Sequence, residues 1–337
     1  MTLNILYCSD NNYAPYLGIS MVSVMEHNKD AEKIVFYVVS DRISEDNVTR
    51  LKRQVEKYGE SRQLVFIDGQ AWVEQLVAMD ILPYRGGQAT NLRLFFMEYI
   101  AKDVERLLYL DCDTIIQGDL TPMFETDMES TAAAVVLDSL SGVDYKKIIG
   151  FTEKDQYFNA GVILFNVKNW VAHECEKTLR ANMKDPKQHL PNNDQDFLNI
   201  LLKDDKTILS PKYNFQTTHQ VYSDKTYFST YKQPSYYTKE EIDEARNAPV
   251  ILHAYRFLGQ FPWHKSSLHP WTALWWEYVA KSEWSDLSPK ENQGTLFKIE
   301  RIIFRLTPKA IFLPLLQKWQ THTFKKRFNL MQRKGEK

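Results

Sequence analysis

Two aspartates one residue apart, Asp111 and Asp113, directly follow the apolar run Leu107-Leu108-Tyr109-Leu110. The run is typical of a buried strand, so the pair brings negative charge to the edge of a sheet. Desolvating that charge is costly unless a cation binds there, and we therefore interpret the two carboxylates as ligands of a divalent metal. Ligands of open α/β sheets gather beyond the carboxyl ends of the strands, which indicates metal-assisted chemistry on a phosphate-bearing compound.

A second interpretation of this pair needs no metal, because Asp-x-Asp also occurs in turns and helix caps. Cys112 lies between the two aspartates. Neighbouring side chains of an extended segment point in opposite directions, so the thiol should face away from a site that both carboxylates face. We therefore do not count Cys112 as a metal ligand.

Apolar runs and periodic stretches alternate along the first 280 residues. The expected strands are 3–8, 34–39, 63–67, 107–110, 131–137, 157–167, which a small-residue turn precedes, and 249–253. The expected helices are 16–25, 43–58, 91–100, 197–202 and 271–278, whereas residues 211–248 have little periodicity and are expected to form loops over the site. This alternation predicts an α/β fold with a mostly parallel sheet and helices on its faces.

The composition of the 337 residues, 44% hydrophobic and 25% charged, is that of a globular protein with about two domains. Three cysteines without metal-ligand spacing fit a reducing compartment better than a disulfide framework, so we expect the cytoplasm. We find neither a secretory leader nor a run of about 18 apolar residues, which indicates neither export nor a spanning helix.

Charge is divided unevenly along the chain. Residues 296–337 contain 11 Lys and Arg against 2 Asp and Glu, a net charge of +9, which leaves 31 against 41, or −10, for residues 1–295. An acidic body argues against nucleic acid as a partner. The basic tail, in which apolar residues recur at helical spacing, has the composition of a segment that lies on an anionic membrane.

Several short motifs occur in an order that resembles glycosyltransferase family 8, in particular its bacterial lipooligosaccharide α-galactosyltransferases and α-glucosyltransferases. They are Asn11-Asn12-Tyr13, Arg93, Asp111-Cys112-Asp113, Phe158-Asn159-Ala160-Gly161, Asn193-Asp194-Gln195-Asp196, and His253 with Pro262-Trp263. The resemblance covers roughly residues 3–280. It implies a nucleotide-diphospho-sugar transferase fold of the GT-A type and a retaining transfer of a hexose from a UDP-sugar.

The resemblance also implies a third metal ligand, His253. Two carboxylates and an imidazole suit Mn2+ better than Mg2+, which prefers oxygen ligands, although Mg2+ remains the second candidate. A cation there would act on the diphosphate leaving group of the donor. Without the resemblance, the favoured reading of His253 is an ordinary histidine at the end of a strand.

The same resemblance assigns donor contacts to a set of residues near these motifs. They are Asp10, Asn12 and Tyr13 for the uracil and ribose, Arg93 for the sugar or diphosphate, Cys112 beside the metal ligands, and Asn159 and Ala160 for the sugar. Each has a structural alternative: a helix N-cap for Asp10 and Asn12, a solvated charge for Arg93, and a turn for Asn-Ala-Gly.

Asp194 and Gln195 match the residues nearest the anomeric carbon in the family. The neutral amide of Gln195 is a poor covalent nucleophile, so we favour front-face attack by the acceptor hydroxyl, with the departing phosphate as its base. The structural alternative is the acidic first turn of a helix. Asp138, at the end of its strand, is a weaker candidate for acceptor binding.

One segment departs from the family pattern His-x-x-Gly-x-x-Lys-Pro-Trp, whose glycine and lysine bind the diphosphate. Here the segment from His253 to Trp263 is two residues longer, and Phe261 occupies the position of the lysine. We expect Gly259 to supply the glycine contact and Arg256 or Lys265 to replace the lysine.

We divide the chain into a transferase domain, residues 1–280, and a basic amphipathic helical tail, residues 281–337. The tail is expected to hold the enzyme on the inner face of the cytoplasmic membrane, where a lipid-linked saccharide acceptor of a cell-surface glycan or glycolipid would lie. The alternative is a pair of helices packed on the body. Two other functions stay open: a glycogenin-like self-glucosylating protein and a catalytically silent nucleotide-sugar binding protein.

Overall fold

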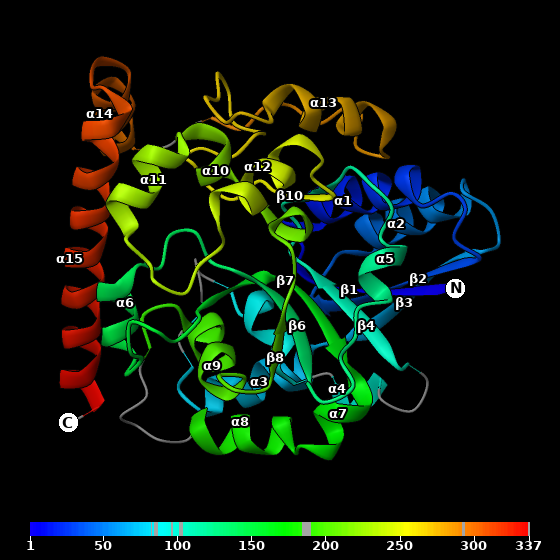
Figure 1. Ribbon diagram of the computed structural model, residues 1–337. Coiled ribbons are helices and arrows are strands. Elements are labelled where there is room, and N and C mark those ends of the chain that lie inside the picture. Colours follow the sequence, from blue (N-terminus) through cyan, green and yellow to red (C-terminus); the bar gives the residue numbers. More distant parts are fainter. Residues whose placement is uncertain are drawn as a thin grey trace.

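The computed structural model describes residues 1–81, 83, 87–95, 97–100, 104–183, 190–291 and 294–335 (Figure 1). The strands are β1 Thr2–Asp10, β2 Lys33–Asp41, β3 Arg62–Asp68, β4 Arg106–Leu110, β5 Thr114–Ile116, β6 Ala133–Leu137, β7 Phe158–Asn166, β8 Lys206–Ile208, β9 Phe215–Gln216 and β10 Ile251–His253. The helices of the first 201 residues are α1 Ala14–His27, α2 Glu45–Glu56, α3 Gln70–Ala78, the 3-10 helix η1 Ala89–Leu94, α4 Met97–Ile100, α5 Thr121–Phe124, α6 Val143–Ile148, α7 Val167–Ala172, α8 Cys175–Met183 and α9 Asn193–Leu201. The later ones are η2 Pro211–Asn214, α10 Thr217–Val221, α11 Asp224–Tyr231, α12 Lys239–Asn247, α13 Thr272–Lys281, α14 Thr295–Leu306 and α15 Lys309–Gly335.

The main sheet has seven strands in the order β3-β2-β1-β4-β7-β6-β8. All neighbouring pairs are parallel except those that β7 makes with β4 and β6. The prediction of a mostly parallel sheet is therefore confirmed. Strand order reverses between β1 and β4, and such a switch point leaves a crevice at the carboxyl ends of the strands. Because β7 runs the other way, its first residues reach the same edge.

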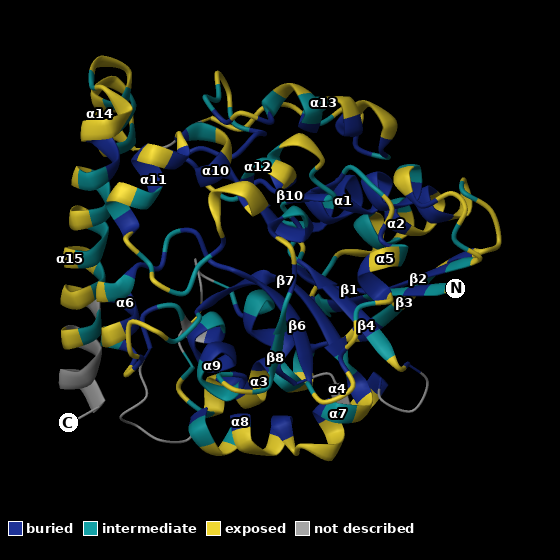
Figure 2. Cartoon of the chain, in the orientation of Figure 1, coloured by how far each residue is buried: buried dark blue, intermediate teal, exposed yellow. Residues whose placement is uncertain are grey.

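Apolar side chains cover both faces of this sheet. In β1, Leu3, Ile5 and Tyr7 join one buried cluster, whereas Leu6 and Cys8 join the other, as the alternation of side chains along a strand requires. Helices α1, α2 and α13 contribute to the first cluster, and α3, α8 and α9 contribute to the second. Figure 2 shows the sheet as the buried centre of the molecule.

A smaller sheet, β5-β10-β9, lies beside the carboxyl edge of the main one. Strand β10 is antiparallel to β5, and His253 pairs with Thr114. Since β5 follows β4 after three residues, the segment Asp111–Asp113 connects the two sheets.

Two local predictions were wrong. Residues 211–248 are largely helical, because Ser223 caps α11, Thr238 forms a capping box with Glu241 at α12, and buried tyrosines pack the helices down. The helix expected over 91–100 is instead η1 followed by the short α4, with residue 96 outside the described residues. The strand expected over 157–167 is confirmed by β7, so the alternative reading of Asn-Ala-Gly as a turn does not hold.

The tail forms two helices with different surroundings. Phe312 and Leu313 of α15 are buried against an aromatic cluster that includes Tyr231, and α15 runs along α6 and α11 (Figure 1). By contrast, α14 has no buried residue. Among the helices that the structure describes, none combines the length and apolarity that a bilayer crossing requires.

Candidate active site

A cavity of about 400 Å³ lies at the switch point of the sheet. Twelve of the residues singled out in the sequence line it: Asp10, Tyr13, Arg93, Asp111, Cys112, Asp113, Asp138, Asn159, Ala160, Asp194, Gln195 and His253. Two others do not. Asn12 is exposed, and a Cβ on Gly259 would lie 2.3 Å from the Phe297 ring, so Gly259 faces the tail. Donor contacts of both residues stay predictions.

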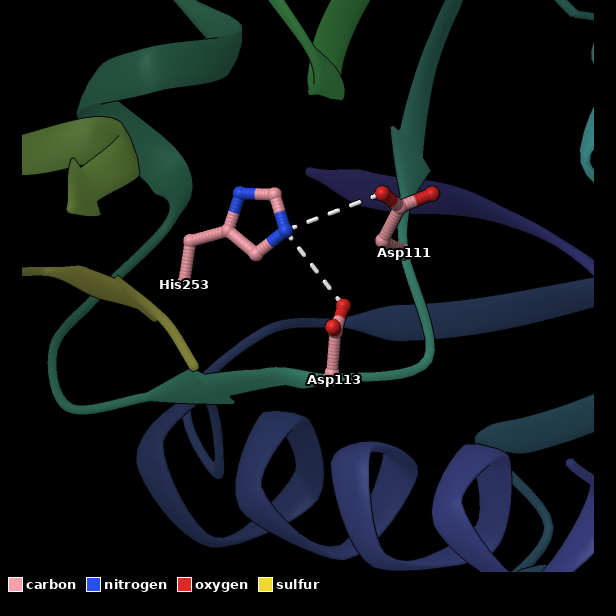
Figure 3. Close-up of side chains that lie close together, drawn as sticks. All are labelled: Asp111, Asp113 and His253. Atoms are coloured by element: carbon pink, nitrogen blue, oxygen red, sulfur yellow. Dashed lines mark ion pairs between the residues drawn. The ribbon is translucent and has the colours of Figure 1, made fainter. Parts of the chain in front are cut away.

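Asp111, Asp113 and His253 point toward one another from the sheet junction (Figure 3). The Nε2 atom of His253 lies 3.7 Å from an Asp111 carboxylate oxygen and 3.3 Å from one of Asp113. One ligand atom of each lies within 4.8 Å of the others. Ligands about 2.1 Å from one cation are themselves about 3 to 4 Å apart, so this arrangement fits a divalent metal.

The imidazole is held in place by Asn214, a residue that the sequence analysis missed. The Asn214 side-chain oxygen lies 3.0 Å from His253 Nδ1, so a proton on Nδ1 is donated there and Nε2 is the ring nitrogen that faces the carboxylates. Asn214 in turn donates to Asn159, which donates to Asp138. Burial alone would lower the pKa of His253, but the hydrogen bond and charge of Asp113, with the charge of Asp111, raise it.

Gly161 supplies the space that this cluster occupies. A Cβ at this position would lie 2.2 Å from His253 Cε1 and 2.8 Å from an Asp111 oxygen. The Gly161 carbonyl also accepts the Asp111 N–H at 2.8 Å. The absence of a side chain at this point of β7 is therefore what lets the strand approach the cluster.

Asp111 is fixed by two partners on its other oxygen. The Tyr109 hydroxyl donates to it at 2.6 Å, and the Arg93 guanidinium lies 3.1 Å away. Arg93 is 4% exposed, packs over the Tyr109 ring and donates to the Ala160 carbonyl. Arg93 is therefore a buried cation inside the site and not the solvated helix charge of the alternative reading.

The same guanidinium binds Asp194, whose carboxylate lies 2.8 Å from Arg93 Nε. Burial raises the pKa of Asp194 to about 6, although the charge of Arg93 opposes the shift. Asp194 lies in the first turn of α9, where a helix favours negative charge. Asp111, Arg93 and Asp194 thus form one charge chain along the cavity wall, in which Arg93 and Asp194 are buried.

Both ends of the Gln195 amide are occupied. Its carbonyl oxygen accepts the Ala160 N–H at 3.0 Å, and its amide nitrogen donates to the Tyr157 hydroxyl at 3.0 Å. Behind it, the buried Asp196 accepts hydrogen bonds from Tyr145, Tyr157 and the Asn192 N–H. This part of α9 is therefore held rigidly against β7.

Cys112 takes no part in the cluster of Asp111, Asp113 and His253. Its thiol donates to the Cys8 carbonyl at 3.7 Å. Burial, with the charges of Asp111 and Asp113, raises the pKa of the Cys112 thiol well above its ordinary value. The sulfur therefore stays protonated and is directed at β1.

The other end of the cavity is formed around the first loop. Asp10 accepts the Tyr13 N–H at 2.9 Å, an interaction that fixes the start of α1. The side chain of Tyr13 is half-buried and lines the cavity beside Tyr16 and Trp263.

Phe261, at the position of the family lysine, is buried and stacked on Trp263. Of the two cations proposed to replace the lysine, Arg256 lines the cavity, whereas Lys265 pairs with Glu291 at 2.9 Å. Lys290 is a further cation near this end that the sequence analysis did not single out. Its ammonium lies 5.0 Å from the centre of the Tyr16 ring, and burial lowers its pKa while the charge of Asp10 opposes that shift.

Asp138 lines the cavity, but its carboxylate is already engaged. It accepts the N–H groups of Leu140 and Ser141 and the side-chain amide of Asn159. The sequence analysis also missed four tail residues that line the same cavity, Gln317, Gln320, Thr321 and Phe324. Their helical spacing is visible in the sequence, but the sequence does not show which surface of the protein they face.

Comparison with known protein families identifies the family of this chain. The model of the glycosyl transferase family 8 matches residues 4–267. The chain therefore belongs to glycosyltransferase family 8, and it has the α/β, GT-A-like fold of that family. The resemblance inferred from the short motifs is confirmed.

Three curated proteins are among its relatives. "General stress protein A" of Bacillus subtilis is 25% identical over 86% of this chain and 98% of its own length. "Lipopolysaccharide 1,2-glucosyltransferase" of Escherichia coli K12 is 28% identical over 87% of this chain and 82% of its own length. "Lipopolysaccharide 1,3-galactosyltransferase" of Salmonella typhimurium is 26% identical over 84% of this chain and 79% of its own length.

Solved structures show the same architecture. The galactosyltransferase LgtC, crystallised with donor and acceptor sugar analogs, superposes with a TM-score of 0.66 at 25% identity, covering 84% of this chain and 96% of LgtC. The glycosyltransferase GlyE of Streptococcus pneumoniae has a TM-score of 0.59 at 23% identity. The match covers 87% of this chain and 66% of the GlyE chain.

Proposed function

We propose that this chain is a retaining hexosyltransferase that transfers galactose or glucose from a UDP-sugar to a saccharide acceptor of a cell-surface glycan or glycolipid, with Mn2+. The observation that carries the proposal is the cluster of Asp111, Asp113 and His253 in the cavity at the switch point. Relatives named as a glucosyltransferase and a galactosyltransferase support the reaction class and leave the hexose open.

The residues present fit a transition metal. Asn214 occupies His253 Nδ1, so Nε2 would bind a cation held between the two carboxylates, and a mixed nitrogen and oxygen set favours Mn2+ over Mg2+. A cation held there would neutralise the charge that the diphosphate gains as the glycosidic bond breaks.

The charge chain of Asp111, Arg93 and Asp194 would then position the sugar. Arg93 bridges Asp111 and Asp194, so the Asp194 carboxylate is fixed near the metal ligands, where it would stabilise positive charge developing at the anomeric carbon. The Gln195 carbonyl oxygen accepts the Ala160 N–H, which supports a role in shaping β7 rather than as a covalent nucleophile. We therefore favour front-face attack by the acceptor hydroxyl. Trapping of a glycosyl adduct on Asp194 or Gln195 by intact-protein mass spectrometry would contradict this mechanism.

The decisive experiment measures UDP release from a panel of UDP-sugars with Mn2+, Mg2+ or chelator. We expect release from UDP-galactose or UDP-glucose with Mn2+ and none with chelator. Mass analysis of the products separates the alternatives. A labelled saccharide supports the transferase, a labelled protein supports a glycogenin-like self-glucosylating protein, and neither product supports a silent nucleotide-sugar binding protein.

The tail supports a second part of the proposal, attachment to the inner face of the cytoplasmic membrane. Its exposed apolar side chains are Leu296, Ile299, Ile302, Ile303, Leu306, Ile311, Leu315 and Trp319. Basic residues accompany them, and each Lys or Arg near an anionic surface contributes about 1 kcal/mol to attachment. On this view residues 1–280 carry the chemistry and residues 281–337 carry the attachment, although Phe312 and Leu313 also join α15 to the body.

A further inference from the structure

One face of α15 closes the cavity opposite the metal ligands. Gln317, Gln320, Thr321 and Phe324 line it together with Tyr145 and Ser141 of the α6 region. The four α15 residues are spaced by three and four positions, so they lie on a single face of the helix. Figure 1 shows α15 running beside α6 along one side of the molecule.

This face is fixed to the body at both ends. Leu313 is fully buried in an aromatic cluster, and the Phe324 ring packs edge-on against Tyr145 with 5.0 Å between ring centres. Between these anchors, a Cβ on Gly142 would lie 3.6 Å from the Gln317 side-chain nitrogen, so the helix passes close to the start of α6. The helix is therefore a wall of the cavity.

The polar groups between the anchors have unused hydrogen-bonding capacity. Gln317, Gln320 and Thr321 are half-buried, and within the described part of the chain their side chains make no hydrogen bond. An amide both donates and accepts, as a hydroxyl does, so these side chains match the groups of a sugar ring. Phe324 and Tyr145 add aromatic surface beside them.

From this arrangement we infer that the inner face of α15 binds the acceptor saccharide, with Gln320 and Thr321 donating to and accepting from its hydroxyls. The inference rests on the proposed function and extends it, because it assigns the acceptor to the tail side of the cavity and the donor to the side of Asp10 and Tyr13. The tail then has two faces with separate tasks, acceptor recognition inward and membrane attachment outward.

The test removes two hydrogen-bonding groups with little change in volume, in the double variant Gln320→Leu, Thr321→Val. We expect the KM for the saccharide acceptor to rise about tenfold, as the loss of two neutral hydrogen bonds predicts, while the KM for the UDP-hexose changes less than about twofold. Thr323→Val is the matched control, because Thr323 is exposed on the same helix and its hydroxyl only returns to the Trp319 carbonyl. Equal changes in the two KM values, or no change in either, would overturn the inference.

A binding measurement keeps this test independent of turnover. Saturation-transfer NMR with a panel of mono- and disaccharide methyl glycosides, in the presence of UDP, should give signals with the wild-type chain and with Thr323→Val. The signals should be weaker with the double variant. If the wild-type chain releases no UDP from any donor but this difference holds, the proposed function fails and the saccharide site stands. If no glycoside binds, or all three proteins bind alike, the acceptor site is wrong.

Discussion

The two ends of the cavity are built differently. At the proposed metal end, Tyr109 and Arg93 fix Asp111, and Asn214 fixes His253. At the α15 end, Gln320 and Thr321 make no side-chain hydrogen bond within the described residues. Catalysis gains from groups already in place, because they cost no reorganisation when charge develops. Recognition of varied hydroxyls gains from groups that are still free to turn, so acceptor preference could change without disturbing the chemistry.

The largest effect should come from Asp113→Asn, which keeps the volume of the side chain and removes its charge from the metal end. We expect Mn2+-dependent UDP release to fall by about 10³-fold, the loss typical when a preorganised charge-stabilising group is removed. Asp204→Asn, a change of the same type at an exposed carboxylate, is the control and should leave the rate unchanged. A rate for Asp113→Asn within about threefold of wild type would show that the cluster does not hold the catalytic metal.

Gly161→Ala tests how tightly the metal end is packed. Its methyl group would collide with His253 Cε1, so the imidazole must turn away from the carboxylates. We expect Mn2+ affinity to fall about 10- to 100-fold by titration calorimetry, as when the partners that orient a ligand are lost. Gly118→Ala is the matched control, because a Cβ there meets Val250 at an ordinary distance of 3.4 Å. Unchanged affinity in Gly161→Ala would show that the cluster tolerates displacement.

Asp196 extends the rigid region behind Gln195 and gives a pH-dependent test. Burial raises its pKa from 3.8 to about 6, although the hydrogen bond from Tyr157 opposes the shift. The folded chain binds this proton more tightly than the unfolded chain, so the carboxyl lowers stability as the pH rises from about 4 to about 6, and the loss is complete above that.

Asp196→Asn cannot ionise and escapes this loss. Between about pH 4.5 and about pH 7.5, the free energy of unfolding should shift by about 2 kcal/mol in favour of the variant relative to wild type. Urea unfolding of both proteins at the two pH values measures the shift. A difference between wild type and variant that is independent of pH would show that Asp196 titrates normally.

The smallest effect should come from the outer face of the tail. Ile303 and Leu306 are 47% and 80% exposed, so their double replacement by serine should change the free energy of unfolding by less than about 0.5 kcal/mol. Affinity for anionic vesicles, measured by sedimentation, should fall about tenfold because the apolar contact with the bilayer is lost. Val77→Ser, at a 60% exposed valine of α3, is the control. Equal sedimentation of all three proteins would place the attachment surface elsewhere.

The fold could be predicted largely from the sequence because its strands are buried on both faces. Such strands read as continuous apolar runs, and those of β1, β2, β4, β6 and β7 were all recognised. The helices of residues 211–248 were missed because their stability comes from packing among tyrosines, which has no helical period. The capping box at Thr238 and Glu241 was visible in the sequence and would have located α12.

The candidate site was predictable only where a residue type carries its chemistry with it. Carboxylates at strand ends could be recognised as candidate ligands from the sequence. Asn214 could not, because only the fold of η2 places it beside His253. The need for glycine at position 161 is visible only in the structure, where a Cβ would lie 2.2 Å from the His253 imidazole. Gln320 and Thr321 could not be assigned because helical spacing defines a face without saying what it faces.

The junction between the two sheets has a consequence for heat stability. Asp111 directly follows β4 of the seven-stranded sheet, while His253 ends β10 of the three-stranded one, so an ion bound by both residues would link the two sheets. Anything that binds only the folded chain raises its melting temperature with concentration. The melting temperature of the chain should therefore rise with Mn2+ concentration, and this rise should need neither nucleotide nor sugar.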